Sequence, residues 1–351
     1  MTVLGKMASP ARTARGTRLI KDTDRARRFT IFHVDAWRRR LFAAAVILFS
    51  TQAAAQNFPE KNITLLHAYS PGSSSSITLR AIGDAAAKTL GKKIVVEDKP
   101  GAGGALAPTY MLKMGKPDGY TLSQLPQPLL RIPHIQKTEF DVLTDFTWII
   151  RIVDYTYALV VKPDAQWRNL NELITYAKAN PGKMTYATSG VGVTMHMVME
   201  ELATMNNIRW VHAPHRTSAD MMNAVIGGHI DMMAAAVSYA PLVDAGKIRV
   251  LAILGANRLK RWPQIPTAKE QGYDVNASSS YGIGGPKGMD PKVVKILHDA
   301  FRKALDDPEF VKTMEQYDQI KSYLNTEDYT RWVREQYAVE KGVVERFGLK
   351  Q

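Results

Sequence analysis

The sequence predicts an α/β protein in which strands and helices alternate and the sheets are mainly parallel. Short apolar segments alternate with segments of helical periodicity, and Gly- and Pro-rich turns separate them. The 351 residues are 45% apolar and 23% charged, as in globular proteins. About 295 residues remain after an N-terminal leader. We expect them to form two α/β lobes, with a ligand site at strand ends or between the lobes.

The first 55 residues predict an export signal. They carry 11 Lys/Arg and 3 Asp, a net charge of +8, and the rest of the chain carries only +5. "WRRR" at 37–40 precedes the apolar run "LFAAAVILFSTQ" and the small residues Ala53 and Ala55. We therefore expect cleavage near Ala55 and a periplasmic mature protein. Because the remaining charge is nearly balanced and interspersed, we expect no nucleic-acid binding.

The first half of the mature chain begins with a strand signal at 62–69, "NITLLHAY". A serine-rich run separates it from a predicted helix over 77–91, where Gly91 is the expected C-cap. The following segments predict a strand at 92–98, a tight loop at 99–104, strands at 120–125 and 157–163, and a helix over 169–182.

The second half repeats the pattern. It predicts a strand at 183–189, a glycine loop at 190–193, a helix over 194–205, a strand at 208–214, a helix over 217–228, strands at 229–236 and 248–254, and an amphipathic helix over 293–305. Thr217 and Asp220 have the spacing of a capping box at the start of the second of these helices.

Two strand-to-helix turns have the composition of an anion site. "YSPGSSSS" (69–76, the first loop) contains no Lys, Asp or Glu, and its serines precede a predicted helix N-terminus, where backbone N–H groups attract negative charge. One serine would suffice for capping alone. "TSGVGVT" (188–194, the second loop) repeats the device. We infer that the two loops hold opposite ends of one anionic ligand.

Other functions find less support. The chain has no cysteine, which excludes thiol nucleophiles and cysteine-ligated metals. "GAGG" at 101–104 lacks the third glycine of a dinucleotide fingerprint, and no G-x-S-x-G elbow occurs. Pro214 between His212 and His215 disfavours a metal site. We therefore expect no cofactor, no metal and no catalytic residue. Two alternatives stay open, an exported serine-dependent hydrolase and a phosphate- or oxyanion-binding protein.

The motifs "PGAGG", "PDGYTL", "SG-x-G" and "GG-x-(I/V)-D", in this order and at these spacings, resemble those of one family from about Phe58 to the C-terminus. These are the periplasmic solute-binding proteins of tripartite tricarboxylate transporters, the Bug or TctC family. The resemblance implies a two-lobed, type II-like periplasmic binding protein with a carboxylate in the interlobe cleft. It also implies delivery to a membrane permease of one large and one small subunit, without catalysis. We expect a monomer with lobe 1 at 56–156 and 282–351 and lobe 2 at 157–281.

The resemblance also suggests the ligand contacts. In the first loop they are Tyr69, Gly72, Ser73, Ser74, Ser75 and Ser76. In and after the second loop they are Thr188, Ser189, Gly190, Gly192, Thr194 and His196. By analogy with the family's usual "YKGGAP" segment, His215, Arg216 and Thr217 also lie near the cleft.

The first loop departs from the family's usual P-G-G-x-x-D pattern. Ser73 replaces the second glycine and Ser76 replaces the aspartate. Losing an acid makes the pocket less negative, which favours a ligand with two carboxylates and no amine. An aromatic acid of phthalate type is one option, since Tyr69, Tyr155, Tyr157 and Tyr239 are available for stacking. On this hypothesis Ser76 is the main determinant of which carboxylate is accepted.

Overall fold

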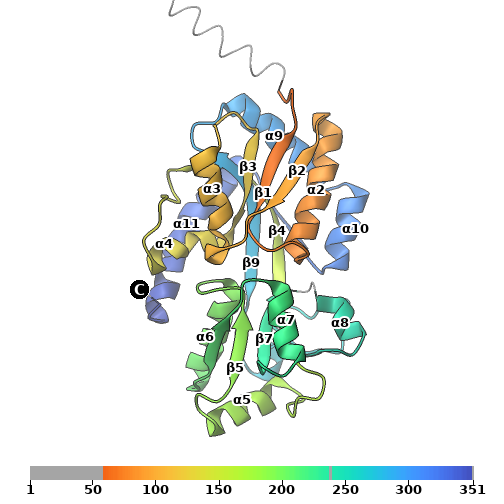
Figure 1. Ribbon diagram of the computed structural model, residues 1–351, viewed down its shortest axis with the longest axis vertical. Helices are drawn as coiled ribbons and strands as arrows, with labels where there is room; N and C mark the ends of the chain where they lie inside the picture. The colour runs from red at the N-terminus through yellow and green to blue at the C-terminus, as the bar shows by residue number, and fades with distance from the viewer. Residues whose placement is uncertain (1–57, 237–238, 350–351) are drawn as a thin grey trace, which may run out of the picture. The chain divides into compact units, whose positions relative to one another are not determined.

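The computed structural model describes residues 58–236 and 239–349 (Figure 1). The predicted leader and its cleavage point near Ala55 therefore lie outside the described residues. Within the described ranges, no helix is both long enough and apolar enough to span a membrane. The strands are β1 (Ile63–His67), β2 (Ile94–Asp98), β3 (Thr121–Pro126), β4 (Phe146–Val161), β5 (Thr185–Thr188), β6 (Val211–Pro214), β7 (Met232–Ala236), β8 (Arg249–Ile253), β9 (Ser278–Pro286) and β10 (Ile320–Leu324).

Helices follow most of the strands. They are α2 (Ser74–Leu90), α3 (Leu106–Met114), α4 (Ile132–Ile135), α5 (Leu170–Ala179), α6 (Thr194–Asn206), α7 (Ser218–Ile226), α8 (Ala240–Asp244), α9 (Pro291–Ala304), α10 (Pro308–Gln316) and α11 (Thr326–Arg346). Short 3-10 turns occur at η1 (Ala102–Gly104), η2 (Gln127–Leu130) and η4 (Lys269–Gln271).

Strand β4 belongs to both halves of a two-lobed fold (Figure 1). Its residues 146–156 pair with β9, and its residues 157–161 pair with β7. The strand order is β2-β1-β3-β9-β4-β7-β5-β6, with β8 and β10 also paired to β4. The half that contains β1 to β3 is called the first half below, and the half that contains β5 to β8 the second.

The sheets are mixed, whereas the sequence predicted mainly parallel ones. Pairs β1–β2, β1–β3, β5–β6 and β5–β7 are parallel, as the alternation of strands and helices predicted. The pairs around the shared strand, β3–β9, β4–β9, β4–β7, β4–β8 and β4–β10, are antiparallel. The antiparallel part follows from two strands. Strand β9 lies between β3 and β4 and runs opposite to both, and β4 runs opposite to β7, β8 and β10.

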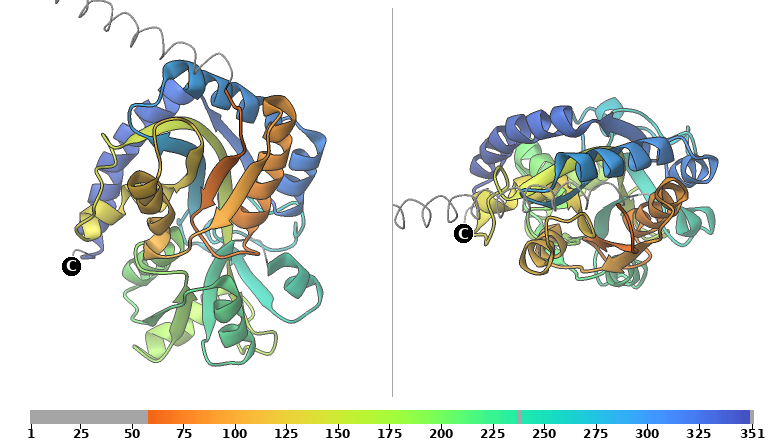
Figure 2. Two further views of the ribbon diagram at one scale, coloured as in Figure 1. Left: turned by 45° about the horizontal axis from the view of Figure 1, so that its top comes forward. Right: turned by 90° about the horizontal axis from the view of Figure 1, so that it is seen from above.

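Helices cover both faces of the sheet in the first half, and the side chains of β1 divide between two cores. Ile63 and Leu65 pack in the core that contains α2 and α9, whereas Leu66 packs in the core that contains α3 and α11. Successive strand residues point to opposite faces, so a strand buried on both sides is apolar throughout. Figures 1 and 2 show these helices around the sheet.

The expected lobe boundaries, 156/157 and 281/282, stay a prediction. The first boundary falls where β4 exchanges its partner β9 for β7. We propose that the return crossing lies just before Ser278, because all of β9 from Ser278 onward pairs within the first half.

Candidate ligand-binding cleft

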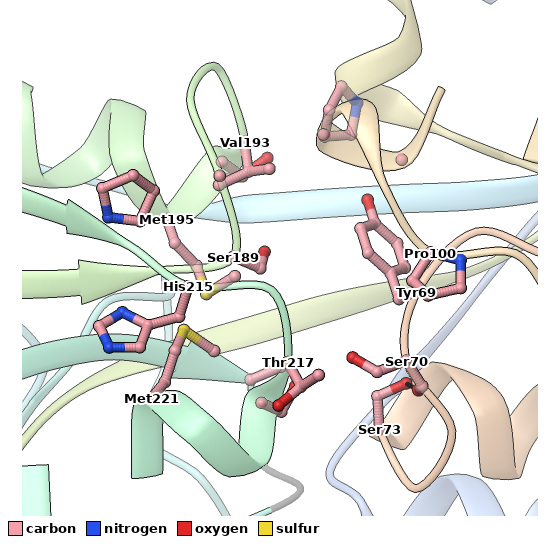
Figure 3. Close-up of a pocket in the computed structure, with 18 of the residues that line it drawn as sticks. Tyr69, Ser70, Ser73, Pro100, Ser189, Val193, Met195, His215, Thr217 and Met221 are labelled. Atoms are coloured by element: carbon pink, nitrogen blue, oxygen red, sulfur yellow. Dashed lines mark hydrogen bonds between the residues drawn. The ribbon is translucent and has the colours of Figure 1, made fainter. Parts of the chain in front are cut away.

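A cleft of about 840 Å³ is lined by residues of both halves. Figure 3 shows Tyr69, Ser70 and Ser73 on one side, facing Ser189 and Thr217 on the other. This volume is in the range that holds small metabolites and cofactors, roughly 300–1,000 Å³. The lining comes from the first loop, the loop 100–104, the segment 128–136, the middle of β4, the end of β7, the second loop and the segment 214–222.

Most of the predicted contact residues line this cleft. They are Tyr69, Ser73, Ser74, Ser75, Ser189, Gly190, Thr194, His215, Arg216 and Thr217. Gly72, Ser76, Thr188, Gly192 and His196 are not part of its lining. The structure therefore brings both predicted loops to one cavity, and the role of each residue in ligand binding stays a prediction.

The serine run is the first turn of helix α2, whereas the sequence predicted a loop up to residue 76. Ser73 is the N-cap, and its Oγ accepts a hydrogen bond from the Ser76 backbone N–H at 3.3 Å. The Ser73 hydroxyl donates in turn to the Ser70 carbonyl at 2.8 Å. A serine at this position satisfies one of the free N–H groups of the helix start, which is why the helix begins so early.

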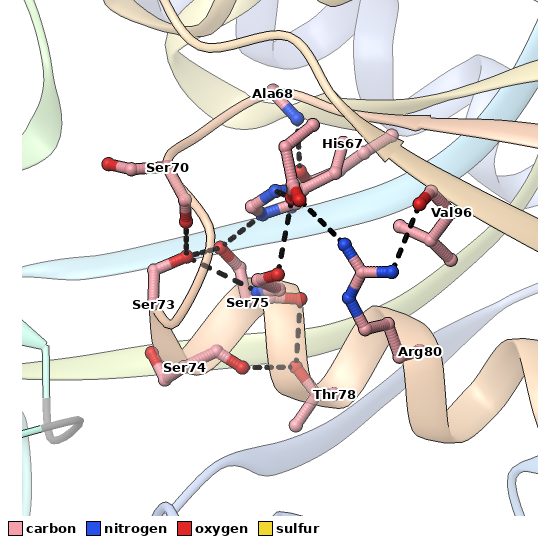
Figure 4. Close-up of polar contacts among 12 residues, drawn as sticks. His67, Ala68, Ser70, Ser73, Ser74, Ser75, Thr78, Arg80 and Val96 are labelled. Atoms are coloured by element: carbon pink, nitrogen blue, oxygen red, sulfur yellow. Dashed lines mark hydrogen bonds and ion pairs between the residues drawn. The ribbon is translucent and has the colours of Figure 1, made fainter. Parts of the chain in front are cut away.

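A buried chain of hydrogen bonds lies behind the first loop (Figure 4). His67 Nδ1 lies 2.7 Å from Asp98 Oδ1, and His67 Nε2 lies 2.8 Å from Ser75 Oγ. Asp98 also accepts from Ser76 Oγ at 3.2 Å and from Arg80 Nη2 at 2.6 Å. The first loop is thereby joined to strand β2, which lies beside β1.

His67 is a neutral imidazole in this chain of bonds. Its side chain has no exposed surface. Burial lowers the pKa of His67 from 6.5 to about 4, against the opposing effect of Asp98. Arg80 neutralises the same carboxylate, so Asp98 is not free to stabilise an imidazolium.

The second loop is held mainly by backbone contacts and by Thr188. The Thr188 hydroxyl donates to the Gly190 carbonyl at 2.9 Å and lies 2.6 Å from His212 Nε2. The Gly192 backbone N–H donates to His196 Nδ1 at 3.2 Å. His196, a predicted contact residue, thus supports the loop from behind, within helix α6.

Three hydroxyls of the cleft lining are buried and have no hydrogen-bond partner. They are Ser189 Oγ, Thr194 Oγ1 and Tyr239 OH. Thr194 is 7% exposed and Tyr239 is 2% exposed, so solvent reaches neither side chain freely. A buried polar group without a partner costs about 1–3 kcal/mol, which a bound acceptor would remove. Two of the three belong to the second loop.

Two histidine rings stack behind the second loop. The rings of His196 and His212 lie 4.2 Å apart with an interplanar angle of 20°. Burial lowers the pKa of His196 to about 3, with smaller contributions from His212 and Arg131. Burial, followed by the charge of His215, lowers the pKa of His212 to about 4. Both rings are therefore neutral at physiological pH. Nowhere in the described ranges are three or more His, Asp or Glu side chains grouped to hold a metal ion.

One buried ion pair ties the second loop to the first half. Arg131 Nε donates to Glu340 Oε2 of α11 at 2.7 Å, and Arg131 Nη1 donates to the Gly192 carbonyl at 2.8 Å. Both side chains of the pair are at most 5% exposed. Gln127 donates to the other oxygen of Glu340 at 3.1 Å. Sequence reasoning missed this pair, since its members are 209 residues apart.

Sequence reasoning also did not identify the loop at 99–104 as part of the cleft. Gly103 has a φ of +63°, and a Cβ there would come within 3.3 Å of the Val191 carbonyl of the second loop. The dense "PGAGG" pattern was the available signal, because glycines cluster where backbones approach closely. Sequence reasoning did not identify the methionines of the cleft either, which are Met195, Met221, Met222 and Met233.

The charge of the lining is simple. Among the described residues that line the cleft, Arg216 is the only Lys, Arg, Asp or Glu. Hydroxyl groups from both halves supply most of the remaining polarity, and alanine, valine, isoleucine and methionine side chains supply an apolar section. Such a surface suits an anion with an apolar body.

Comparison with known proteins identifies relatives along nearly the whole described chain. The family model described as "Tripartite tricarboxylate transporter family receptor" matches residues 78–349. The "UPF0065 protein in gbd 5'region" of Cupriavidus necator is 40% identical over 298 residues, which is 85% of this chain and 91% of the relative. Protein BugT of Bordetella pertussis is 28% identical over 327 residues, covering 89% and 98% of the two chains.

Solved structures share the fold. The periplasmic binding protein BugD superimposes with a TM-score of 0.79 at 25% identity, covering 84% of this chain and 99% of that one. A structure described as a periplasmic transporter gives a TM-score of 0.78 at 28% identity, with the same coverage. These likenesses confirm the predicted two-lobed fold of a periplasmic binding protein.

Proposed function

We propose that this chain, which belongs to the tripartite tricarboxylate transporter receptor family, captures a small carboxylate in its cleft for uptake by a membrane permease. Members of the family are solute-binding receptors, and the structural relatives are periplasmic. In this proposal the chain is exported, loses its leader near Ala55, acts as a monomer and catalyses no reaction.

The observation that carries the proposal is the unsatisfied hydroxyl pair of the second loop. Ser189 Oγ and Thr194 Oγ1 are buried donors without partners, and among the described residues that line the cleft only Arg216 carries a full charge. A carboxylate is an acceptor with about four lone-pair sites, so it can satisfy both hydroxyls and leave sites for backbone N–H groups. The absence of Asp and Glu from the described lining favours an anion as well.

We further propose that the ligand is a dicarboxylate with an apolar body. Two polar loops face each other across the cleft, so they can hold polar groups at both ends of an apolar body. Tyr69, Tyr155, Tyr157 and Tyr239 all belong to the lining, which supports an aromatic acid of phthalate type. Two of the four already stack on other rings, Tyr155 on Tyr281 and Tyr239 on Trp262. The other two make edge contacts, Tyr69 with His67 and Tyr157 with Tyr155.

Isothermal titration of the purified protein tests the proposal. The panel contains the dicarboxylates phthalate, adipate and malate, the amino acids aspartate and glutamate, and inorganic phosphate. We expect micromolar or tighter binding of a dicarboxylate and no response to phosphate. Tight binding of aspartate or glutamate alone would overturn the dicarboxylate assignment, and binding of phosphate alone would favour an oxyanion-binding protein.

One observation favours a second candidate, a serine hydrolase. Asp98, His67 and Ser75 are joined in the order and at the distances of a nucleophilic triad, and Ser75 lines the cleft. Against it, His67 has no exposed surface, and a general base must also deliver its proton to the leaving group. Labelling by a fluorophosphonate, with release of nitrophenol from p-nitrophenyl acetate, would establish the hydrolase. We expect neither.

A further inference from the structure

The hydroxyl hydrogen of Ser75 has a fixed partner inside the protein. A carboxylate only accepts hydrogen bonds, so the 2.7 Å contact of Asp98 Oδ1 with His67 Nδ1 places a hydrogen on that ring nitrogen. In a neutral ring the other nitrogen, Nε2, then carries a lone pair. It lies 2.8 Å from Ser75 Oγ and has no hydrogen to give, so Ser75 is the donor.

The neutral state of His67 follows from its surroundings. The groups that face the ring are Asp98 on β2, the guanidinium of Arg80 on α2, the Ser75 hydroxyl and the backbone carbonyl of Tyr69. Arg80 Nη2 already donates to Asp98 Oδ2 at 2.6 Å. An imidazolium would therefore be fully buried beside a carboxylate that is already neutralised. The pKa of about 4 that burial gives His67 agrees with this.

The second neighbour of Ser75 does not change this assignment. Ser73 Oγ lies 3.1 Å from Ser75 Oγ, but the Ser73 hydroxyl donates to the Ser70 carbonyl at 2.8 Å. Ser73 also accepts from the Ser76 backbone N–H. The Tyr155 hydroxyl also lies beside Ser75, and because the Ser75 hydrogen is given to His67, Tyr155 can only donate to Ser75. Any hydrogen bond that Ser75 makes to a molecule in the cleft therefore uses the remaining lone pair of its oxygen.

We infer that Ser75 is a hydrogen-bond acceptor toward the ligand and selects a carboxylate that also carries a hydroxyl group. This inference rests on the proposed function, and it adds that the ligand presents a hydrogen-bond donor to Ser75. A carboxylate oxygen placed against Ser75 Oγ would be repelled, because the lone pairs of the two oxygens would face each other. The carboxylates therefore lie at the unsatisfied hydroxyls of the second loop and at Arg216, and a hydroxyl hydrogen of the ligand faces Ser75.

Matched ligand pairs test the inference by titration. The pairs are succinate and malate, benzoate and 4-hydroxybenzoate, and phthalate and 4-hydroxyphthalate, each with wild type and Ser75→Ala. In at least one pair we expect the hydroxylated acid to bind about tenfold more tightly to wild type, the range of one hydrogen bond. Ser75→Ala should remove this advantage, so that the two acids of the pair bind the variant with equal affinity. Ser123→Ala, at a buried hydroxyl that donates to the Gln124 carbonyl outside the cleft, should keep it.

The outcomes distinguish a failure of the proposed function from a failure of the inference about Ser75. If none of the acids binds, the proposed function fails and the inference falls with it. If acids bind but the hydroxyl gives no advantage, or if the advantage survives Ser75→Ala, the inference alone is overturned.

The protonation of His67 can also be measured directly in the wild-type protein. Its ring ¹⁵N signals, assigned by comparison with His67→Gln, should show a protonated Nδ1 and an unprotonated Nε2 at pH 7. A protonated Nε2 would also overturn the inference.

Discussion

The two cleft loops have similar sequences and different hydrogen-bonding states. Both follow a parallel strand, both are rich in Ser, Thr and Gly, and both start a helix. In the first loop Ser73, Ser75 and Ser76 each have a partner within the protein. In the second loop Ser189 Oγ and Thr194 Oγ1 have none. The comparison teaches that two loops of similar hydroxyl-rich composition can differ in which of their hydroxyls are already bonded within the protein.

The glycines of the two loops differ in the space around them. Gly72 and Gly192 have nearly equal φ angles of +77° and +76°. A Cβ at Gly72 would meet nothing within 4 Å, whereas one at Gly192 would lie 2.5 Å from Ile135 Cδ1 of the first half. The first loop therefore stands free at its glycine, and the second loop is in contact across the cleft.

Acid should weaken both loops, because each rests on a neutral histidine. The pKa of His67 falls from 6.5 to about 4 on folding, so the unfolded chain binds the proton more readily. Stability is then complete above pH 6.5 and is lost as the pH falls toward 4, by about 3 kcal/mol for this residue. Urea unfolding at pH 7 and pH 4.5 measures the loss.

The matched variants for this measurement are His67→Gln and His229→Gln. His67→Gln should reduce the pH dependence by the share of this residue, since burial also lowers the pKa values of His196 and His212. His229→Gln, at an exposed histidine, should leave the pH dependence as in wild type. An unchanged slope in His67→Gln would mean that the chain of bonds behind the first loop does not depend on a neutral ring.

Removing the unsatisfied hydroxyls should affect binding and leave the fold intact. The double variant Ser189→Ala with Thr194→Val should lower the affinity for the tightest dicarboxylate about 100-fold, since hydrogen bonds to a charged group contribute roughly 1.5–3 kcal/mol each. Its melting temperature should not fall, because no bond within the protein is lost. Titration and thermal melting measure the two effects.

The contrasting variant lies in the first loop. Ser73→Ala removes the N-cap of α2 and should lower the free energy of unfolding by about 1 kcal/mol, with a smaller change in affinity than the double variant. Two results would contradict the difference in hydrogen bonding between the loops. One is wild-type affinity in the double variant, and the other is a larger loss of binding free energy than of unfolding free energy in Ser73→Ala.

The glycine pair gives the smallest expected effect. Gly192→Ala should lower ligand affinity about tenfold, because its methyl group would push against Ile135 and hold the second loop away from the first half. Gly72→Ala carries the same left-handed strain, about 1–2 kcal/mol, without that clash. Its loss should therefore appear in thermal melting and much less in titration. Equal affinity losses in both variants would contradict the account.

Local sequence signals predicted the order of elements and the position of the loops, but not the partners of side chains. The capping residue Thr217 and the strand-to-helix turns depend on neighbours a few residues away, and the structure confirms Thr217 as an N-cap. The full length of β4 was missed, and so were strand β9 and helix α11, because no turn signal or clean periodicity sets their limits.

The environment of Ser76 shows why the site itself could not be predicted fully. Family comparison identified Ser76 as the residue that replaces an aspartate, and its role as specificity determinant stays a prediction. The structure places its hydroxyl 3.2 Å from Asp98, which lies on another strand and 22 residues away. A carboxylate, that of Asp98, therefore lies next to the position where the family usually has an aspartate. Only the pairing of β1 with β2 brings it there.

Arg131 hydrogen-bonds to both halves of the fold with one guanidinium. Its Nη1 donates to the Gly192 carbonyl of the second loop, and its Nε donates to Glu340 on helix α11. Helix α11, whose Val339 beside Glu340 is 55% exposed, is thus connected to the second loop through a single side chain. A change at the surface of this helix that displaces Glu340 would therefore reach the second loop through Arg131.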